Sequence, residues 1–106
     1  IKNNISHINF SSTSISDKAM AFVAGSPNLV YLNLRNTSIT DRGIALIAKL
    51  EHLEYLNMVS TQITDKSVNN IVNLKTLKSV YVYNSGITEK GIQSLQDALP
   101  NAKIVY

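Results

Sequence analysis

The chain has 106 residues, of which 44% are apolar, a formal net charge of +3 and no cysteine. This length suits one domain with a packed core, and the lack of cysteine excludes disulfides, thiol catalysis and thiolate metal sites. No apolar run approaches the roughly 20 residues of a membrane-spanning helix.

A pattern of apolar residues recurs every 24 residues, as from Leu29 to Leu53. The stretch from Leu29 to His52 begins with Leu-x-x-Leu-x-Leu, and similar stretches begin at Ile5, Leu53 and Leu77, with a fifth at Ala102. Self-similarity at a fixed period is typical of solenoid proteins. We therefore expect one domain over residues 1–106, with repeats at 5–28, 29–52, 53–76 and 77–101 and a final strand at 102–106.

Each repeat begins with a predicted strand and continues with a predicted helix. The first eight residues alternate in polarity, which places the fourth and sixth residues toward the core. The strands should stack in parallel, and the rest of each repeat supplies the crossover that parallel strands require. A hydroxyl residue suited to an N-cap and then an acid recur at Ser16-Asp17, Thr40-Asp41, Thr64-Asp65 and Thr88-Glu89. Apolar residues follow at helical spacing, so we expect helices of about two turns on the convex side.

The pattern as a whole resembles the leucine-rich repeat family, in its helical subclass. The column Thr13, Thr37, Thr61 and Ser85 falls where many leucine-rich repeats carry asparagine or cysteine, and Ile-Thr-Asp-x-Gly follows at residues 39–43. The resemblance implies an α/β solenoid, a right-handed superhelix with a concave parallel sheet and convex short helices. It also implies that the hydroxyl column bonds the turning backbone across neighbouring repeats. The repeat specifies a scaffold and not a chemistry.

The last repeats are also similar to the short tails of some bacterial membrane proteins that carry a c-type cytochrome domain. The similar stretch runs from Gly91 to Asn101. This resemblance favours the periplasmic side of the bacterial cell envelope and implies that the chain is a piece of a longer one. No Cys-x-x-Cys-His occurs, and we expect no cofactor. The first repeat lacks a polar cap, so an upstream neighbour or self-association should cover its edge at Ile5, Ile8 and Phe10.

The sequence contains no set of residues in the arrangement that a catalytic site requires. His7 and His52 have no serine or acid at a known motif spacing, and there is no glycine-rich phosphate loop, so we expect no enzyme. The column of helix-start acids could share a cation, but each acid has an adjacent cation and a helix N-terminus to satisfy it. The cations that remain, Lys2 among them, are scattered and form no basic stripe. We expect no metal site, no nucleic-acid binding and no membrane contact by this segment.

The third, fifth and seventh residues of each repeat should point to the concave side. Four of the five tyrosines stand there, and Tyr and Arg dominate binding hot spots. We predict that this face docks a protein, a peptide or a neighbouring domain of the same chain through Tyr31, Asn33, Arg35, Tyr55, Asn57, Tyr81 and Tyr83.

Two alternatives to concave-face docking stay open. The tyrosines can serve only the sheet, as cross-strand pairs that contribute about 0.2–1 kcal/mol each, and the asparagines can form a hydrogen-bonded ladder. The whole chain can also be a structural spacer or capping domain of a larger, cytochrome-linked protein, with no ligand of its own.

Overall fold

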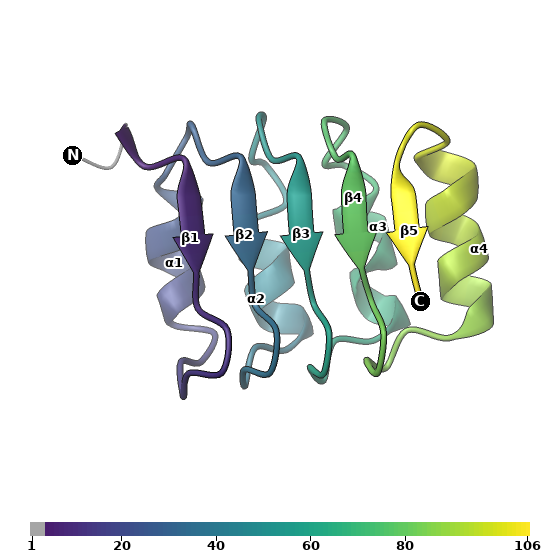
Figure 1. Ribbon diagram of the computed structural model, residues 1–106, viewed down its shortest axis with the longest axis horizontal. Coiled ribbons are helices and arrows are strands. Elements are labelled where there is room, and N and C mark those ends of the chain that lie inside the picture. Colours follow the sequence, from purple (N-terminus) through teal and green to yellow (C-terminus); the bar gives the residue numbers. More distant parts are fainter. Residues whose placement is uncertain (1–3) are drawn as a thin grey trace.

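The computed structural model describes residues 4–106 as a five-stranded parallel sheet backed by helices (Figure 1). Strands and helices alternate: β1 (His7–Asn9), α1 (Ala19–Ala24), β2 (Tyr31–Asn33), α2 (Asp41–Leu46), β3 (Tyr55–Asn57), the 3-10 helix η2 (Asp65–Ser67), α3 (Val68–Ile71), β4 (Ser79–Tyr81), α4 (Glu89–Ala98) and β5 (Lys103–Val105). The strands follow chain order in the sheet, which confirms the expected α/β repeat solenoid. Lys2, one of the scattered cations, lies outside the described residues.

The strand register advances by one period per strand. His7, Tyr31, Tyr55, Ser79 and Lys103 stand opposite one another in successive strands. The last strand keeps this step, since Lys103 follows Ser79 by the same 24 residues as Ser79 follows Tyr55. The extra residue expected in the repeat 77–101 is therefore not found in the strand register. α4 has 10 residues and includes in its helix positions that form loop in the earlier repeats.

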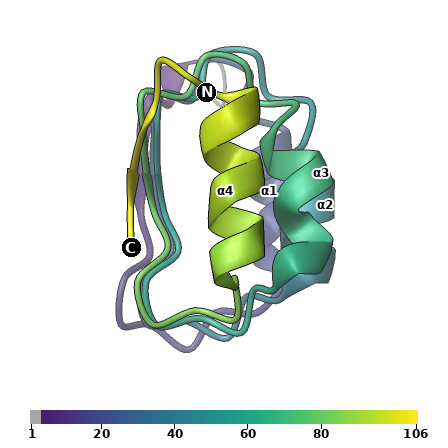
Figure 2. The same cartoon turned by 90° about the vertical axis from the view of Figure 1, so that its right-hand side faces the viewer.

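The core lies between the sheet and the helices. The fourth and sixth residues of the inner repeats, such as Leu32, Leu34, Leu56 and Met58, are completely buried, which confirms the predicted strand orientation. All helices of the described residues lie on this side of the sheet (Figure 2). We call the other side the open face; it corresponds to the expected concave side. Within residues 4–106, no helix has the length and apolar character needed to cross a membrane.

Three of the four predicted N-caps are confirmed. The side chains of Thr40 and Thr64 accept hydrogen bonds from the N–H two residues on, and that of Thr88 accepts from the N–H of Gly91. The prediction for Ser16 is wrong, because α1 begins only at Ala19 and has no side-chain cap. The other caps are held by a carboxylate of the preceding repeat, and no such carboxylate contacts Ser16 in the described part of the chain.

The helix-start acids link each repeat to the next. Asp41 accepts hydrogen bonds from the N–H of Thr64 at 2.8 Å, from its hydroxyl at 2.6 Å and from the Ser67 hydroxyl at 2.6 Å. Burial alone would raise the pKa of Asp41, but the hydrogen bonds from Ser67 and Thr64 and the nearby Lys66 ammonium lower it below its ordinary value of 3.8. The same link joins Asp17 to Thr40 and Asp65 to Thr88.

Glycine makes room for two of these carboxylates. A Cβ at Gly43 would lie 2.5 Å from Oδ1 of Asp17, and one at Gly91 would overlap the carboxylate of Asp65. In the repeat between them this position is Ser67, whose hydroxyl instead donates to the carboxylate it faces. The acids therefore have a structural role, as the sequence suggested, but their partners lie in the next repeat and are not the adjacent cations.

The hydroxyl column does not bond across repeats, and that expectation is wrong. Its members Thr13, Thr37, Thr61 and Ser85 each donate to the main-chain carbonyl three residues earlier, at 2.6–2.7 Å. The residue before each of them has a φ between 54° and 56°, and this left-handed turn folds the hydroxyl back over the end of its own strand. Other groups of the turn make the cross-repeat bonds instead. The N–H of Ser12 donates to the carbonyl of Arg35 at 2.9 Å, and Nδ2 of Asn36 donates to the Ser12 hydroxyl at 3.3 Å.

Candidate interaction surface on the open face

Aromatic rings form a row across strands β1 to β4 on the open face. His7 stacks on Tyr31 with ring centroids 5.3 Å apart, and Tyr31 stacks on Tyr55 at 4.3 Å with an angle of 9° between the ring planes. Tyr81 extends the row at 5.2 Å from Tyr55, tilted by 45°. Tyr81 reaches Tyr55 diagonally, because Ser79 is the residue directly opposite Tyr55 in the strand register. The fold thus brings three of the seven predicted site residues into one continuous row.

The two asparagines of the predicted site are tied to their own backbone. Oδ1 of Asn33 accepts from the N–H of Arg35 at 3.0 Å, and Oδ1 of Asn57 accepts from the N–H of Val59 at 3.0 Å. This is the local side-chain turn that asparagine favours, and it replaces the cross-strand asparagine ladder that the sequence left open. Asn57 is only 8% exposed, so this amide mainly supports its neighbours.

Each of these amides also reaches a tyrosine hydroxyl. Nδ2 of Asn57 donates to the hydroxyl of Tyr55 at 3.2 Å, and Nδ2 of Asn33 lies 3.4 Å from that of Tyr31. Burial raises the pKa of Tyr55 above its ordinary value of 10.0; the hydrogen bond from Asn57 opposes this, and the neighbouring Tyr31 and Tyr81 raise it further. The phenol of Tyr55 therefore stays protonated at neutral pH.

Arg35 and Tyr83 lie beyond the ring row, just after β2 and β4. Both side chains are exposed, Tyr83 by 65%. Among residues 4–106, no ring stacks on Tyr83. These two residues are the most accessible members of the predicted site.

Two residues of this face were missing from the predicted set. His7 stands one period before Tyr31 and begins the ring row, and its shared repeat position was the signal. Lys103 opposes Ser79 in β5, and it was missed because the register of the last strand could not be fixed from the sequence.

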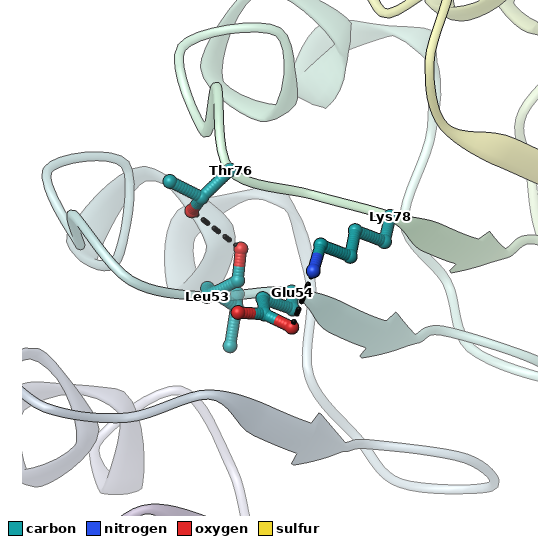
Figure 3. A network of polar contacts seen from close by, with 4 residues as sticks. All are labelled: Leu53, Glu54, Thr76 and Lys78. Atoms are coloured by element: carbon teal, nitrogen blue, oxygen red, sulfur yellow. Dashed lines mark hydrogen bonds and ion pairs between the residues drawn. The ribbon is translucent and has the colours of Figure 1, made fainter.

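A polar pair lies where the chain enters β3 and β4. The ammonium of Lys78 contacts the carboxylate of Glu54 at 3.3 Å (Figure 3). The Lys78 side chain is exposed and that of Glu54 is partly buried. Beside them, the hydroxyl of Thr76 donates to the carbonyl of Leu53 at 2.6 Å and ties the two entering loops together (Figure 3). The negative charge of Glu54 is therefore matched by a neighbouring cation.

Comparison with known proteins supports a leucine-rich-repeat family. Two consecutive stretches, residues 25–48 and 49–72, match a family model described as Leucine Rich repeat. A solved structure of a leucine-rich-repeat protein from Leptospira interrogans is similar over 97% of this chain, with a TM-score of 0.73 and 20% sequence identity. This chain covers 26% of that protein's chain. No curated protein matches the sequence.

These matches bear mainly on the fold. At 20% identity the likeness to the Leptospira protein concerns the fold alone, and it agrees with the α/β repeat solenoid of this chain. Repeats of this kind usually serve protein interaction and are generally non-catalytic. A partner and its binding face have to be argued from the residues themselves.

Proposed function

We propose that this leucine-rich-repeat solenoid is a non-catalytic interaction module that binds a protein or peptide, or a neighbouring domain of its own chain, through its open face. The observation that carries the proposal is the row of rings from His7 to Tyr81, held on a helix-free face of the sheet. The proposed contact residues are Tyr31, Asn33, Arg35, Tyr55, Asn57, Tyr81 and Tyr83.

The exposure of this row favours a binding role over a purely structural one. Tyr31, Tyr55 and Tyr81 remain partly accessible to solvent, whereas the residues that alternate with them in the strands, such as Leu32 and Leu56, are completely buried. Aromatic rings fixed by stacking lose little side-chain entropy when a partner covers them, and they bring a large contact area. A face of five strands about 4.8 Å apart spans roughly 20 Å, which suits a peptide or one edge of a partner.

The test compares tyrosines on and off the open face. Peptides selected against the protein from a random display library would be assayed for binding to the wild type and to variants. The variants Tyr83→Ala and Tyr55→Ala/Tyr81→Ala should lose binding by about ten-fold or more, as expected for hot-spot residues. Tyr106→Ala is the matched control, because Tyr106 is 67% exposed but lies beside Glu89 and Ile92 of α4. Equal loss with Tyr106→Ala, or retained binding in the double variant, would contradict the proposal.

A structural role toward a neighbouring domain is the second candidate, and the N-terminal end of the solenoid favours it. Ile5, Phe10 and Ile15 are only partly buried, whereas Leu29, Leu34 and Ile39 at the same repeat positions are completely buried. A further repeat or a domain of a larger, cytochrome-linked membrane protein would cover this end face. The readout is sedimentation across a range of protein concentrations. Self-association that Phe10→Ser abolishes would favour this role, and a monomer at all concentrations would count against an end face that associates by itself.

A further inference from the structure

The amides of the open face are oriented by the backbone. The N–H groups of Arg35 and Val59 can only donate, so they fix Oδ1 of Asn33 and of Asn57 as the acceptor toward the main chain. The Nδ2 groups must then point away from that turn, toward the tyrosine hydroxyls. The acceptor half of each amide is thus used by the main chain, and the donor half is directed to a tyrosine hydroxyl.

Each of these tyrosine hydroxyls receives an amide N–H and keeps its own hydrogen as a donor. The hydroxyl of Tyr55 accepts the amide of Asn57, and that of Tyr31 faces the amide of Asn33. Each hydroxyl has one hydrogen to give. The rings that carry them are stacked, and even where one hydroxyl donates to the other, the pair uses only one hydrogen internally. The O–H of Tyr31 or that of Tyr55 is therefore left to donate to whatever lies on the face.

The charged residues of the open face are cations, which favour the same electron-rich ligand groups as these hydrogen-bond donors. They are Arg35, just after β2, and Lys103 in β5, both exposed, and the third, fifth and seventh repeat positions of this face contain no Asp or Glu. Glu54 lies at the entry to β3 and is paired with Lys78 (Figure 3). A ligand on this face meets hydrogen-bond donors and cations, and few acceptors.

From this polarity we propose that the open face selects an acidic peptide segment, an inference that rests on the proposed function. The side-chain carboxylates of the peptide meet Arg35, Lys103 and one hydroxyl of the Tyr31–Tyr55 pair. Carboxylates accept charge-assisted hydrogen bonds from guanidinium, ammonium and phenol groups. The chemistry favours a peptide over a nucleic acid, because two separated cations do not form the clustered basic stripe that a phosphate backbone requires. Stacked rings between the cations provide apolar edges for the peptide backbone.

Defined peptides test the charge preference directly. A fluorescein-labelled peptide of alternating Glu and Gly would be titrated with the protein by fluorescence anisotropy, beside matched Gln-Gly and Lys-Gly peptides. In an extended peptide, alternate residues point to the same side, so the Glu side chains can face the sheet together. The Glu-Gly peptide should bind at least about five-fold more tightly than the Gln-Gly peptide, and the difference should shrink as salt screens the charges.

Variants show whether the preference comes from this face. Arg35→Gln should bring the Glu-Gly affinity close to that of the Gln-Gly peptide. Tyr31→Phe and Tyr55→Phe each keep the ring and remove a hydroxyl, and at least one of them should weaken the Glu-Gly affinity by about three-fold or more, as loss of one hydrogen bond does. Lys75→Gln is the matched control, since Lys75 is an exposed cation between α3 and β4 and should leave the affinity unchanged.

Two results would overturn the inference: equal affinity for the Glu-Gly and Gln-Gly peptides, or an equal loss in Lys75→Gln and Arg35→Gln. Library-selected peptides that depend on Tyr83 and carry no excess of Asp or Glu would overturn the acidic preference and leave the proposed function standing. Library-selected peptides that ignore the open-face variants would overturn both.

Discussion

Replacing Asp41 by alanine removes one acceptor of three hydrogen bonds that join the second repeat to the third. The carboxylate accepts the N–H and hydroxyl of Thr64 and the hydroxyl of Ser67, at 2.8, 2.6 and 2.6 Å. A hydrogen bond to a charged group contributes about 1.5–3 kcal/mol, but Asp41 is only partly buried and water can replace part of this. We expect Asp41→Ala to lower the free energy of unfolding by about 2–4 kcal/mol, a large share of the stability of a small domain.

Urea unfolding followed by circular dichroism measures this loss. With a slope of about 2 kcal/mol per molar urea, in the middle of the usual range, the midpoint should fall by about 1–2 M. Glu89→Ala is the matched control, because Glu89 holds the same place in its repeat and accepts no hydrogen bond within residues 4–106. It should lose only its interaction with the helix dipole, about 0.3–1 kcal/mol. If the two variants lose equal stability, the carboxylates do not hold the repeats together.

Three further outcomes follow from the same structure. The pKa of Asp41 is lowered in the folded protein, so its contribution to stability is complete above the unfolded value of about 3.9 and is lost as the pH falls through the folded pKa. Acid unfolding of Asp41→Asn should lack this part of the pH dependence. An acid unfolding profile equal to that of the wild type would contradict a stabilising role of the Asp41 carboxylate. Gly91→Ala should destabilise by about 1–3 kcal/mol in thermal unfolding, because its methyl group overlaps the carboxylate of the preceding repeat, whereas Gly25→Ala at an exposed site with φ of −84° should change little. Tyr55→Ala should lower the free energy of unfolding by about 1–3 kcal/mol through the lost ring stacking and burial. Tyr83→Ala should lower it by less than about 0.5 kcal/mol. Equal melting temperatures of the two variants would show that the ring row adds no stability.

The strand positions and most caps could be predicted because they depend on local patterns. Alternation of polarity fixes which side of a strand meets the core, and Leu32 and Leu34 follow it. A hydroxyl before an acid and an apolar helix is a local N-cap signal, and Thr40 and Thr64 follow that. Ser16 carries the same local signal but no cap forms, since the acid that holds such a cap belongs to the preceding repeat.

Features that depend on contacts between repeats could not be predicted from one repeat alone. The sequence shows Asp41 beside Arg42 and suggests an ion pair, but the carboxylate turns to the cap 23 residues later. Likewise, Asn33 and Asn57 suggested a ladder because they share a column, whereas the backbone N–H two residues on is nearer to each. A backbone donor at fixed geometry wins over a side chain that must first be ordered.

The row of rings was only partly foreseeable. A shared repeat position indicated that His7, Tyr31 and Tyr55 would be neighbours, and the fold stacks them. The diagonal approach of Tyr81 to Tyr55 depends on side-chain rotamers and on the small Ser79 between them, which the sequence pattern does not specify.

Backbone amide shifts of the isotope-labelled protein, recorded by NMR while a selected peptide is added, test the central claim most directly. We predict that the shifts concentrate in β2, β3 and β4 and in the residues just after them, Arg35 and Tyr83 included, while the amides of α1 to α4 stay in place. Shifts confined to the helices, or to the N-terminal end around Ile5 and Phe10, would contradict binding through the open face.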